Sequence, residues 1–173
     1  MLKHTHNTDN SPPVLTLSAG VTAVIGDEGS GKTRLLHQLA AAYEQQVFGC
    51  DLSLPGQDND TAQGCWDAWQ ARYPHFDDAL LRQLIEALNL SEHTHKQLFM
   101  LSTGSRRKVG LAGALASGAM VTLLDQPFVS LDAASIQEVL GFLQDMSAHP
   151  TRAWVVADYT VPKGVDLASL IEL

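Results

Sequence analysis

The chain has few of the features that mark a disulfide-linked or membrane-spanning protein. Its 173 residues include only two cysteines, Cys50 and Cys65, whose spacing fits no metal site, so we expect free thiols in a reducing compartment. No apolar run is as long as a membrane span, and residues 1–10 lack the apolar core of a secretory signal. We therefore expect a cytoplasmic protein with no direct membrane insertion.

Basic residues are also scarce. Eleven lysines and arginines face 19 acidic residues, which gives a net charge of −8. Nucleic acid is therefore not an expected partner, because phosphate contacts along a polynucleotide need a basic surface. A single nucleotide is not excluded, since its site is local. The length and the 45% hydrophobic content fit one α/β domain with a full core.

The most informative segment is 26–33, which reads G-D-E-G-S-G-K-T, the pattern of a phosphate-binding loop. Its glycines let the backbone N–H groups turn into one concavity, which holds a phosphate chain. Lys32 is expected on the outer phosphates and Thr33 on Mg²⁺. The predicted nucleotide-binding set in this segment is Gly26, Asp27, Glu28, Gly29, Ser30, Gly31, Lys32, Thr33 and Arg34. Asp27 and Glu28 occupy free positions of the pattern, so their side chains are expected to face solvent.

The surroundings of this segment support the interpretation. Residues 21–25 are apolar and β-branched, as in a buried strand, and residues 34–43 carry apolar side chains at helical spacing. A strand, a glycine-rich loop and a helix is the arrangement that phosphate binding requires. A glycine-rich turn that matches by chance is the weaker alternative.

The rest of the chain alternates between apolar strands and helices, which predicts an α/β fold with a mostly parallel sheet covered on both faces. We expect a leader over 1–13 and a single domain over 14–173, with a helical subdomain at about 60–100. Further strands are predicted at 46–50, 120–124 and 153–157, with short edge strands at 14–17 and 170–173. Further helices are predicted within 65–96, broken at Pro74, and at 108–117 and 135–146.

Two more segments carry candidate chemistry. Asp125 ends an apolar strand, where a carboxylate of a phosphate-loop fold orients Mg²⁺ opposite the Thr33 hydroxyl. Residues 101–105, L-S-T-G-S, open a helix, and a helix start with hydroxyls is an anion site. Taken alone, this second segment fits an ordinary helix cap better.

The order of these motifs resembles that of the ATP-binding subunits of ABC transporters over residues 14–160. That family has a phosphate loop, a helical region, an L-S-G-G-Q signature, a strand ending in D-E-P and an S-A-L-D turn; here the last three read L-S-T-G-S, L-L-D-Q-P-F and V-S-L-D. The resemblance implies that ATP and Mg²⁺ are bound between two subunits of an ATP-dependent homodimer. Ser102, Thr103 and Gly104 would then face the phosphate loop of the second copy. It also implies a membrane permease as partner.

The chain departs from this family where the family hydrolyses ATP. Gln126 stands where the family has its catalytic glutamate, and a glutamine can hold a water but cannot take its proton. No histidine follows the strand at 153–157, and Asp158 occupies that place. Asp158 either points away from the nucleotide or supplies the base that Gln126 cannot. We therefore expect slow hydrolysis.

Other departures concern specificity and architecture. Residues 1–25 contain no aromatic residue on which adenine could stack, so GTP is not excluded. The β-hairpin subdomain of the family has no counterpart in the short segment after Thr33. Gln57 is the predicted glutamine ligand of Mg²⁺, with Gln63 as competitor. Trp66 and Trp69 pack the helical region or, in a second interpretation, form a docking face for a membrane partner.

The sequence thus leaves three functions open. The first is an ABC-type ATP-binding protein that drives a transport or conformational cycle. The second is a regulatory pseudo-ATPase that binds nucleotide and barely hydrolyses it, as Gln126 suggests. The third is a small-molecule or nucleotide kinase, which the phosphate loop and the size allow.

Overall fold

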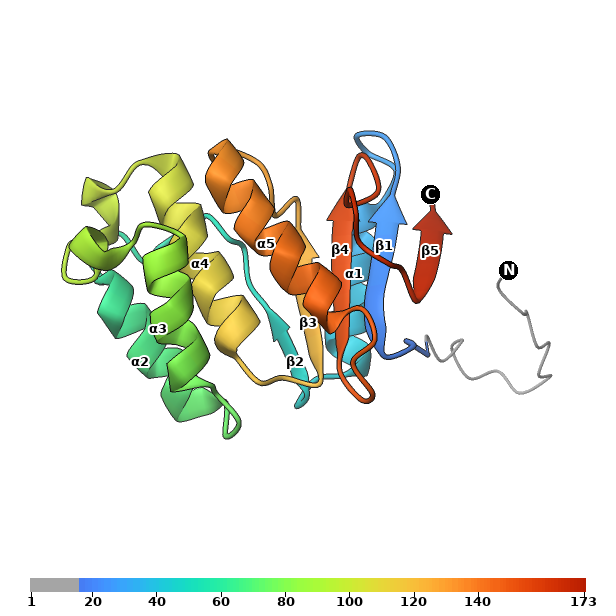
Figure 1. The fold of residues 1–173 in the computed structure, drawn as a ribbon, viewed down its shortest axis with the longest axis horizontal. Helices are drawn as coiled ribbons and strands as arrows, with labels where there is room; N and C mark the ends of the chain where they lie inside the picture. Colours follow the sequence, from blue (N-terminus) through green and yellow to red (C-terminus); the bar gives the residue numbers. More distant parts are fainter. Residues whose placement is uncertain (1–15) are drawn as a thin grey trace.

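A computed structural model describes residues 16–173, which form a parallel five-stranded sheet (Figure 1). The strand order is β2-β3-β4-β1-β5, and every neighbouring pair is parallel. This order confirms the predicted α/β fold of the P-loop type. It places the carboxyl ends of β1, β3 and β4 side by side, where a ligand site of a parallel sheet forms. The strands are β1 (Gly20–Ile25), β2 (Val47–Gly49), β3 (Val121–Asp125), β4 (Ala153–Asp158) and β5 (Ser169–Glu172).

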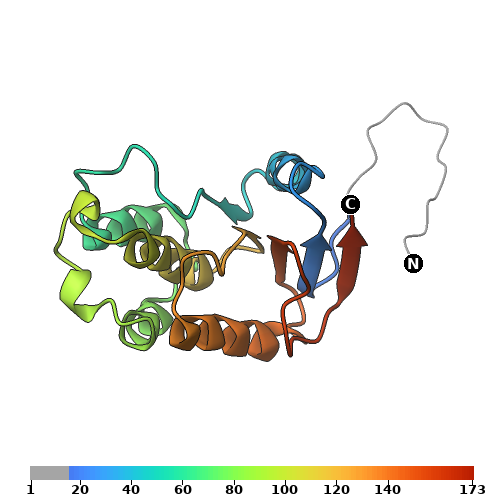
Figure 2. The same cartoon turned by 90° about the horizontal axis from the view of Figure 1, so that it is seen from above.

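Helices cover both faces of the sheet. Seen from above, α1 lies on one side and α5 on the other (Figure 2). Each face has its own core, because successive side chains of a strand point to opposite faces. Val24 and Val155 pack with Leu36 of α1, whereas Val21 and Trp154 belong to the core on the other face. The helices are α1 (Lys32–Ala42), α2 (Ala62–Arg72), α3 (Asp78–Ala87), α4 (Thr103–Ala116) and α5 (Ala133–Met146).

A helical region extends from one end of the sheet (Figure 1). It contains α2, α3 and two 3-10 turns, η1 (Ser91–His93) and η2 (Leu98–Met100), and its helices pack on α4. Trp66 is 1% exposed and donates from its indole N–H to the carbonyl of Val109 at 3.0 Å. Trp69 packs edge-on against Phe48, with ring centroids 5.3 Å apart. Both tryptophans therefore pack the region, and the docking-face interpretation is wrong for them.

Some predicted boundaries shift. The sequence predicts an edge strand at 14–17, but residues 16 and 17, the part of it that the structure describes, form no strand. The edge strand beside β1 is β5. The helix expected from 108 begins at Thr103 instead, because the Ser102 hydroxyl caps it. The predicted leader, 1–13, lies outside the described residues.

The structure also bears on two expected absences. Between Thr33 and residue 50, the chain forms only the rest of α1 and β2, so this segment holds no β-hairpin. Within residues 16–173, no helix has both the length and the apolar character needed to cross a bilayer.

Candidate nucleotide site

The phosphate loop connects β1 to α1 with a tight backbone path. Gly29 and Gly31 have φ values of 76° and 103°, in the left-handed region that glycine tolerates best. α1 begins at Lys32 with no side-chain cap, so its first N–H groups remain directed at the loop. A free helix start carries partial positive charge and favours an anion. The loop thus has the backbone of a phosphate site.

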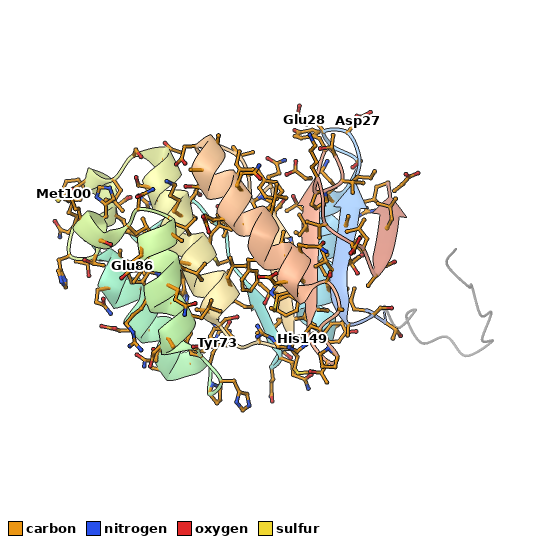
Figure 3. All side chains as sticks on the ribbon, in the orientation of Figure 1. Asp27, Glu28, Tyr73, Glu86, Met100 and His149 are labelled. Atoms are coloured by element: carbon orange, nitrogen blue, oxygen red, sulfur yellow. The ribbon has the colours of Figure 1, made fainter. Side chains whose placement is uncertain are left out.

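Lys32 lies inside this loop. Its side chain is buried, and its Nζ donates to the carbonyls of Gly26 at 2.6 Å and Asp27 at 2.8 Å. The same ammonium lies 4.7 Å from the ring centroid of Tyr159. The chain therefore holds one positive charge at the centre of the phosphate loop. Asp27 and Glu28 are exposed at the outer tip of the loop, as Figure 3 shows.

Thr33 and Asp125 form the next part of the site. The Thr33 hydroxyl donates to Asp125 Oδ2 at 2.7 Å, which joins the start of α1 to the end of β3. A hydroxyl and a carboxylate are hard oxygen donors of the kind that Mg²⁺ takes, with water and phosphate oxygens completing its shell. The donor set therefore fits the predicted Mg²⁺.

Gln126 follows Asp125 in a strained backbone conformation. Its φ is 47°, which costs a residue other than glycine roughly 1–2 kcal/mol. Two hydrogen bonds hold it there: its N–H donates to Ala157 O at 2.8 Å, and Arg107 Nη2 donates to its carbonyl at 2.6 Å. These bonds hold Gln126 beside the Thr33–Asp125 pair, where all three line one pocket.

Asp158 ends β4 beside the end of β1. Burial raises the pKa of its carboxyl above the usual value, and repulsion from Asp125 adds to the rise. The N–H of Tyr159, which donates to Asp158 Oδ1 at 2.7 Å, and the charge of Lys32 act in the opposite direction on this pKa. The Asp158 carboxyl thus interacts electrostatically with both Lys32 and Asp125, while its Oδ1 accepts a hydrogen bond from the backbone of the next residue.

The pocket has a volume of about 620 Å³. Several of its lining residues are not predicted as site residues from the sequence, because the segment after β2, the basic run within α4 and the apolar positions of α1 and β3 belong to no motif. Burial raises the pKa of the Cys50 thiol to about 12, and hydrogen bonds from Ser53 lower the pKa of Asp51, so the pocket holds a neutral thiol and a carboxylate. Besides Thr33, Asp125 and Gln126, the pocket is lined by Leu36, His37, Ala40, Gly49, Cys50, Asp51, Leu52, Arg107 and Leu123.

Gln57, the predicted glutamine ligand of Mg²⁺, does not reach this pocket. Its Oε1 accepts from Cys65 Sγ at 3.3 Å, in the loop that leads to α2. The competitor Gln63 donates to Asp67 on its own helix at 2.8 Å. Gln57 as a ligand of Mg²⁺ therefore stays a prediction, and the segment directly after β2, with Asp51, occupies this side of the pocket.

The predicted signature lies at the start of α4. Ser102 Oγ accepts from the N–H of Ser105 at 3.1 Å, so it caps the helix as the local pattern predicts. Ser102 and Thr103 are exposed. Gly104 lies directly against the carbonyl of Ser130, where a Cβ atom would clash. The signature is thus packed on the V-S-L-D turn, with its helix start open to solvent.

Two basic residues near this helix start, Arg106 and Lys108, form ion pairs. Arg106 pairs with Asp58 at 2.5 Å and also donates to the carbonyl of Leu54. Lys108 pairs with Asp132 at 2.5 Å, and Asp132 also caps α5 through the N–H of Ser135. Arg34, predicted in the nucleotide set, is exposed on α1.

Comparison with solved structures supports the fold. An ABC transporter ATP-binding protein from Pyrococcus furiosus superposes with a TM-score of 0.71 at 20% identity, over 89% of this chain and 84% of that one. The ATP-binding subunit of another ABC transporter superposes with a TM-score of 0.63 at 17% identity, over 80% of this chain and 68% of the other. At such low identity these matches show the fold alone.

Comparison of sequences adds the family. The taurine import ATP-binding protein TauB of Sinorhizobium fredii is 30% identical over an alignment of 182 positions, which covers 91% of this chain and 67% of that protein. TauB of Pseudomonas fluorescens is 29% identical over an alignment of 167 positions that covers 84% of this chain, and this chain spans 62% of its length. No protein-family model matches the chain. The order of motifs, the sheet and these relatives agree, and the chain belongs to the family of ABC transporter ATP-binding proteins.

Proposed function

We propose that this chain binds Mg-ATP at a site that a second copy completes, and that it hydrolyses ATP slowly to drive a transport or conformational cycle. The observation that carries the proposal is the 2.7 Å hydrogen bond between Thr33 and Asp125 beside the buried Lys32. A cation-binding pair and a phosphate-binding ammonium next to a free helix start form the set that Mg-ATP needs.

Each part of the site has a separate task in binding. The N–H groups of residues 26–33 hold the phosphates, and Lys32 exchanges a loop carbonyl for phosphate oxygens. Thr33 and Asp125 hold Mg²⁺, which neutralises phosphate charge when it is bound. The family names of the relatives support ATP as the nucleotide.

Hydrolysis is limited by Gln126. Its amide orients a water beside the terminal phosphate, but it cannot accept the proton of that water. Loss of a general base typically costs about 10²–10⁴-fold in rate. Asp158 is the second candidate base, because burial raises its pKa toward neutral pH, where a carboxylate is a better proton acceptor.

A second copy is needed because the signature is not in the pocket of its own chain. Ser102, Thr103 and Gly104 are absent from the residues that line the pocket with Thr33. The β1–α1 loop and the start of α4 lie at the same end of the molecule (Figure 1). Two copies that face each other with this end can therefore place each signature on the phosphate loop of the other.

The partner that the cycle drives is proposed to be a membrane permease, since the relatives are import proteins by name. A groove of about 440 Å³ on the helical region suits a short segment of such a partner. Phe99 lines it and is 59% exposed, and its neighbour Met100 is 61% exposed at the outer edge of the molecule (Figure 3). A purified chain should retain a membrane protein identifiable by mass spectrometry, and Phe99→Glu should release it; retention by the variant contradicts this docking site.

The central test measures binding, assembly and turnover in one preparation. Calorimetry with Mg-ATP should show binding, and light scattering should show dimers with ATP that fall apart without it. Phosphate release should be well below about one per second. Faster turnover contradicts the role of Gln126, and ATP binding without dimers under every condition contradicts the composite site. Binding and dimerisation with no detectable hydrolysis would instead favour the pseudo-ATPase.

A further inference from the structure

Tyr159 stands beside the phosphate loop although no motif includes it. It follows the last residue of β4, and its ring centroid lies 4.7 Å from Lys32 Nζ. Its side chain is 48% exposed, so it covers the loop from the solvent side without being fixed in a core. An aromatic ring over an ammonium at this distance is a cation–π contact.

The contacts of Lys32 define what the ring occupies. An ammonium has three N–H donors. Two of them are directed to the carbonyls of Gly26 and Asp27, at 2.6 Å and 2.8 Å, and the ring of Tyr159 covers a further side. A phosphate oxygen that reaches Lys32 must therefore enter next to this ring. The aromatic side chain and the terminal phosphate become neighbours on binding.

The main chain of Tyr159 is held in place, whereas its side chain is half exposed. Asp158 pairs with Ile25 across the sheet, directly before the phosphate loop. The N–H of Tyr159 donates to Asp158 Oδ1 at 2.7 Å. The half-exposed ring, by contrast, can change its rotamer toward solvent. Its hydroxyl can thus be carried onto a phosphate that Lys32 holds.

The chemistry of the neighbours favours the hydroxyl as a phosphate ligand. A carboxylate such as Asp158 offers only acceptors when it is ionised, whereas the hydroxyl of a tyrosine can donate a hydrogen bond. No histidine occurs in residues 158–173 to supply a ring N–H there. Tyr159 is the residue at the end of β4 that combines a donor with contact to the loop lysine.

We propose that the Tyr159 hydroxyl binds the terminal phosphate of a nucleoside triphosphate and so distinguishes a triphosphate from a diphosphate. The inference rests on the proposed function. When a nucleotide binds, the Tyr159 ring moves off the Lys32 ammonium, which then contacts the phosphate. The Tyr159 hydroxyl donates to an oxygen of the terminal phosphate. Tyr159 then determines the preference of the site for a triphosphate over a diphosphate.

Tyr159→Phe tests this, because it keeps the ring and removes only the hydroxyl. Calorimetry on the full chain with Mg²⁺ should compare ADP with AMP-PNP, a triphosphate analogue that is not hydrolysed. We expect affinity for AMP-PNP to fall about tenfold, as for a lost hydrogen bond to a charged group, with affinity for ADP unchanged. Tyr43→Phe, at the far end of α1, is the matched control and should leave both affinities unchanged.

The outcomes separate this inference from the function on which it rests. If Tyr159→Phe leaves AMP-PNP binding unchanged, or weakens both nucleotides equally, the phosphate contact is overturned while the ATP site stands. If the unmodified chain binds neither nucleotide, the proposed function is overturned and the inference with it. A loss confined to AMP-PNP supports the contact.

Discussion

The Thr33 hydroxyl donates to Asp125 Oδ2 at 2.7 Å, although the two residues are 92 positions apart. Thr33 starts α1 and Asp125 ends β3, and β4 lies between β1 and β3 in the sheet. The bond therefore spans the carboxyl edge of the sheet from the phosphate loop to a strand that is not its neighbour. Mg²⁺ would be bound beside these two oxygens, the Thr33 hydroxyl and Asp125 Oδ2.

Replacing Lys32 with alanine should abolish nucleotide binding. The change removes the ammonium at the centre of the loop, and the loss of two charge-assisted hydrogen bonds to phosphate oxygens corresponds to an affinity loss of at least about 100-fold. Calorimetry with Mg-ATP measures the effect. Lys163→Ala, an exposed lysine before β5, is the control and should bind as the unmodified chain does. Near-normal ATP affinity in Lys32→Ala would rule out the phosphate loop as the binding site.

Replacing Gln126 with glutamate should raise the rate of ATP hydrolysis by roughly 10- to 100-fold, because it supplies a carboxylate that accepts a proton. The backbone position of Gln126 is already fixed by its bonds to Ala157 and Arg107, so the new side chain takes its place. Steady-state phosphate release measures the gain. Gln126→Ala should show no gain. An unchanged rate in Gln126→Glu would place the defect elsewhere, with Asp158 the next residue to test.

Replacing Asp158 with asparagine should stabilise the protein at neutral pH. Burial raises the pKa of this carboxyl in the folded state, so its charged form opposes folding above that raised pKa. The gain should shrink as the pH falls through the raised pKa and vanish below the ordinary aspartate pKa of 3.8. Urea unfolding at pH 7.5 and near pH 4 measures it. Equal gains at both pH values, or a gain in the exposed Asp145→Asn as well, would contradict burial as the cause.

The same variant also tests catalysis. If Asp158 is the base, then Asp158→Asn loses the residual ATP hydrolysis while it keeps ATP binding. If hydrolysis persists unchanged, Asp158 takes no proton and the slow rate comes from water positioned by Gln126 alone. Phosphate release measured together with ATP affinity distinguishes these results.

Adding a methyl group at Gly104 should destabilise the signature. Its Cβ would meet the carbonyl of Ser130, which cannot move freely because Ser130 itself has a φ of 63°. Forcing an atom into such a contact typically costs about 1–3 kcal/mol. We expect Gly104→Ala to lower the unfolding midpoint and to weaken ATP-dependent dimers.

Gly141 offers the matched control, because no atom lies within 4 Å of the position of its Cβ in α5. Gly141→Ala should stabilise the helix by about 0.5–1 kcal/mol. If the two alanine variants unfold alike, the contact between the signature and the V-S-L-D turn has no energetic weight.

Local sequence patterns were enough to predict the central strands and the phosphate loop. Apolar runs and helical spacing located β1, β3 and β4, and the spacing of Gly26, Lys32 and Thr33 marked the loop. The start of α4 was harder, because Arg106 and Lys108 resemble a solvated basic run until Asp58 and Asp132 are brought to them. Ion pairs between distant segments leave no trace in local sequence.

The sequence by itself determined the fold class and the residues of the phosphate loop, which follow from periodicity and short fixed spacings, and its order of motifs carried the family resemblance. The tertiary structure alone decided that Gln57 lies away from the pocket and that Tyr159 lies over Lys32. The physical reason is that the parallel sheet aligns the ends of β1, β3 and β4, whose residues are far apart in the chain. Which side chains meet at that edge depends on strand order and on loop paths, and neither is encoded in any single segment.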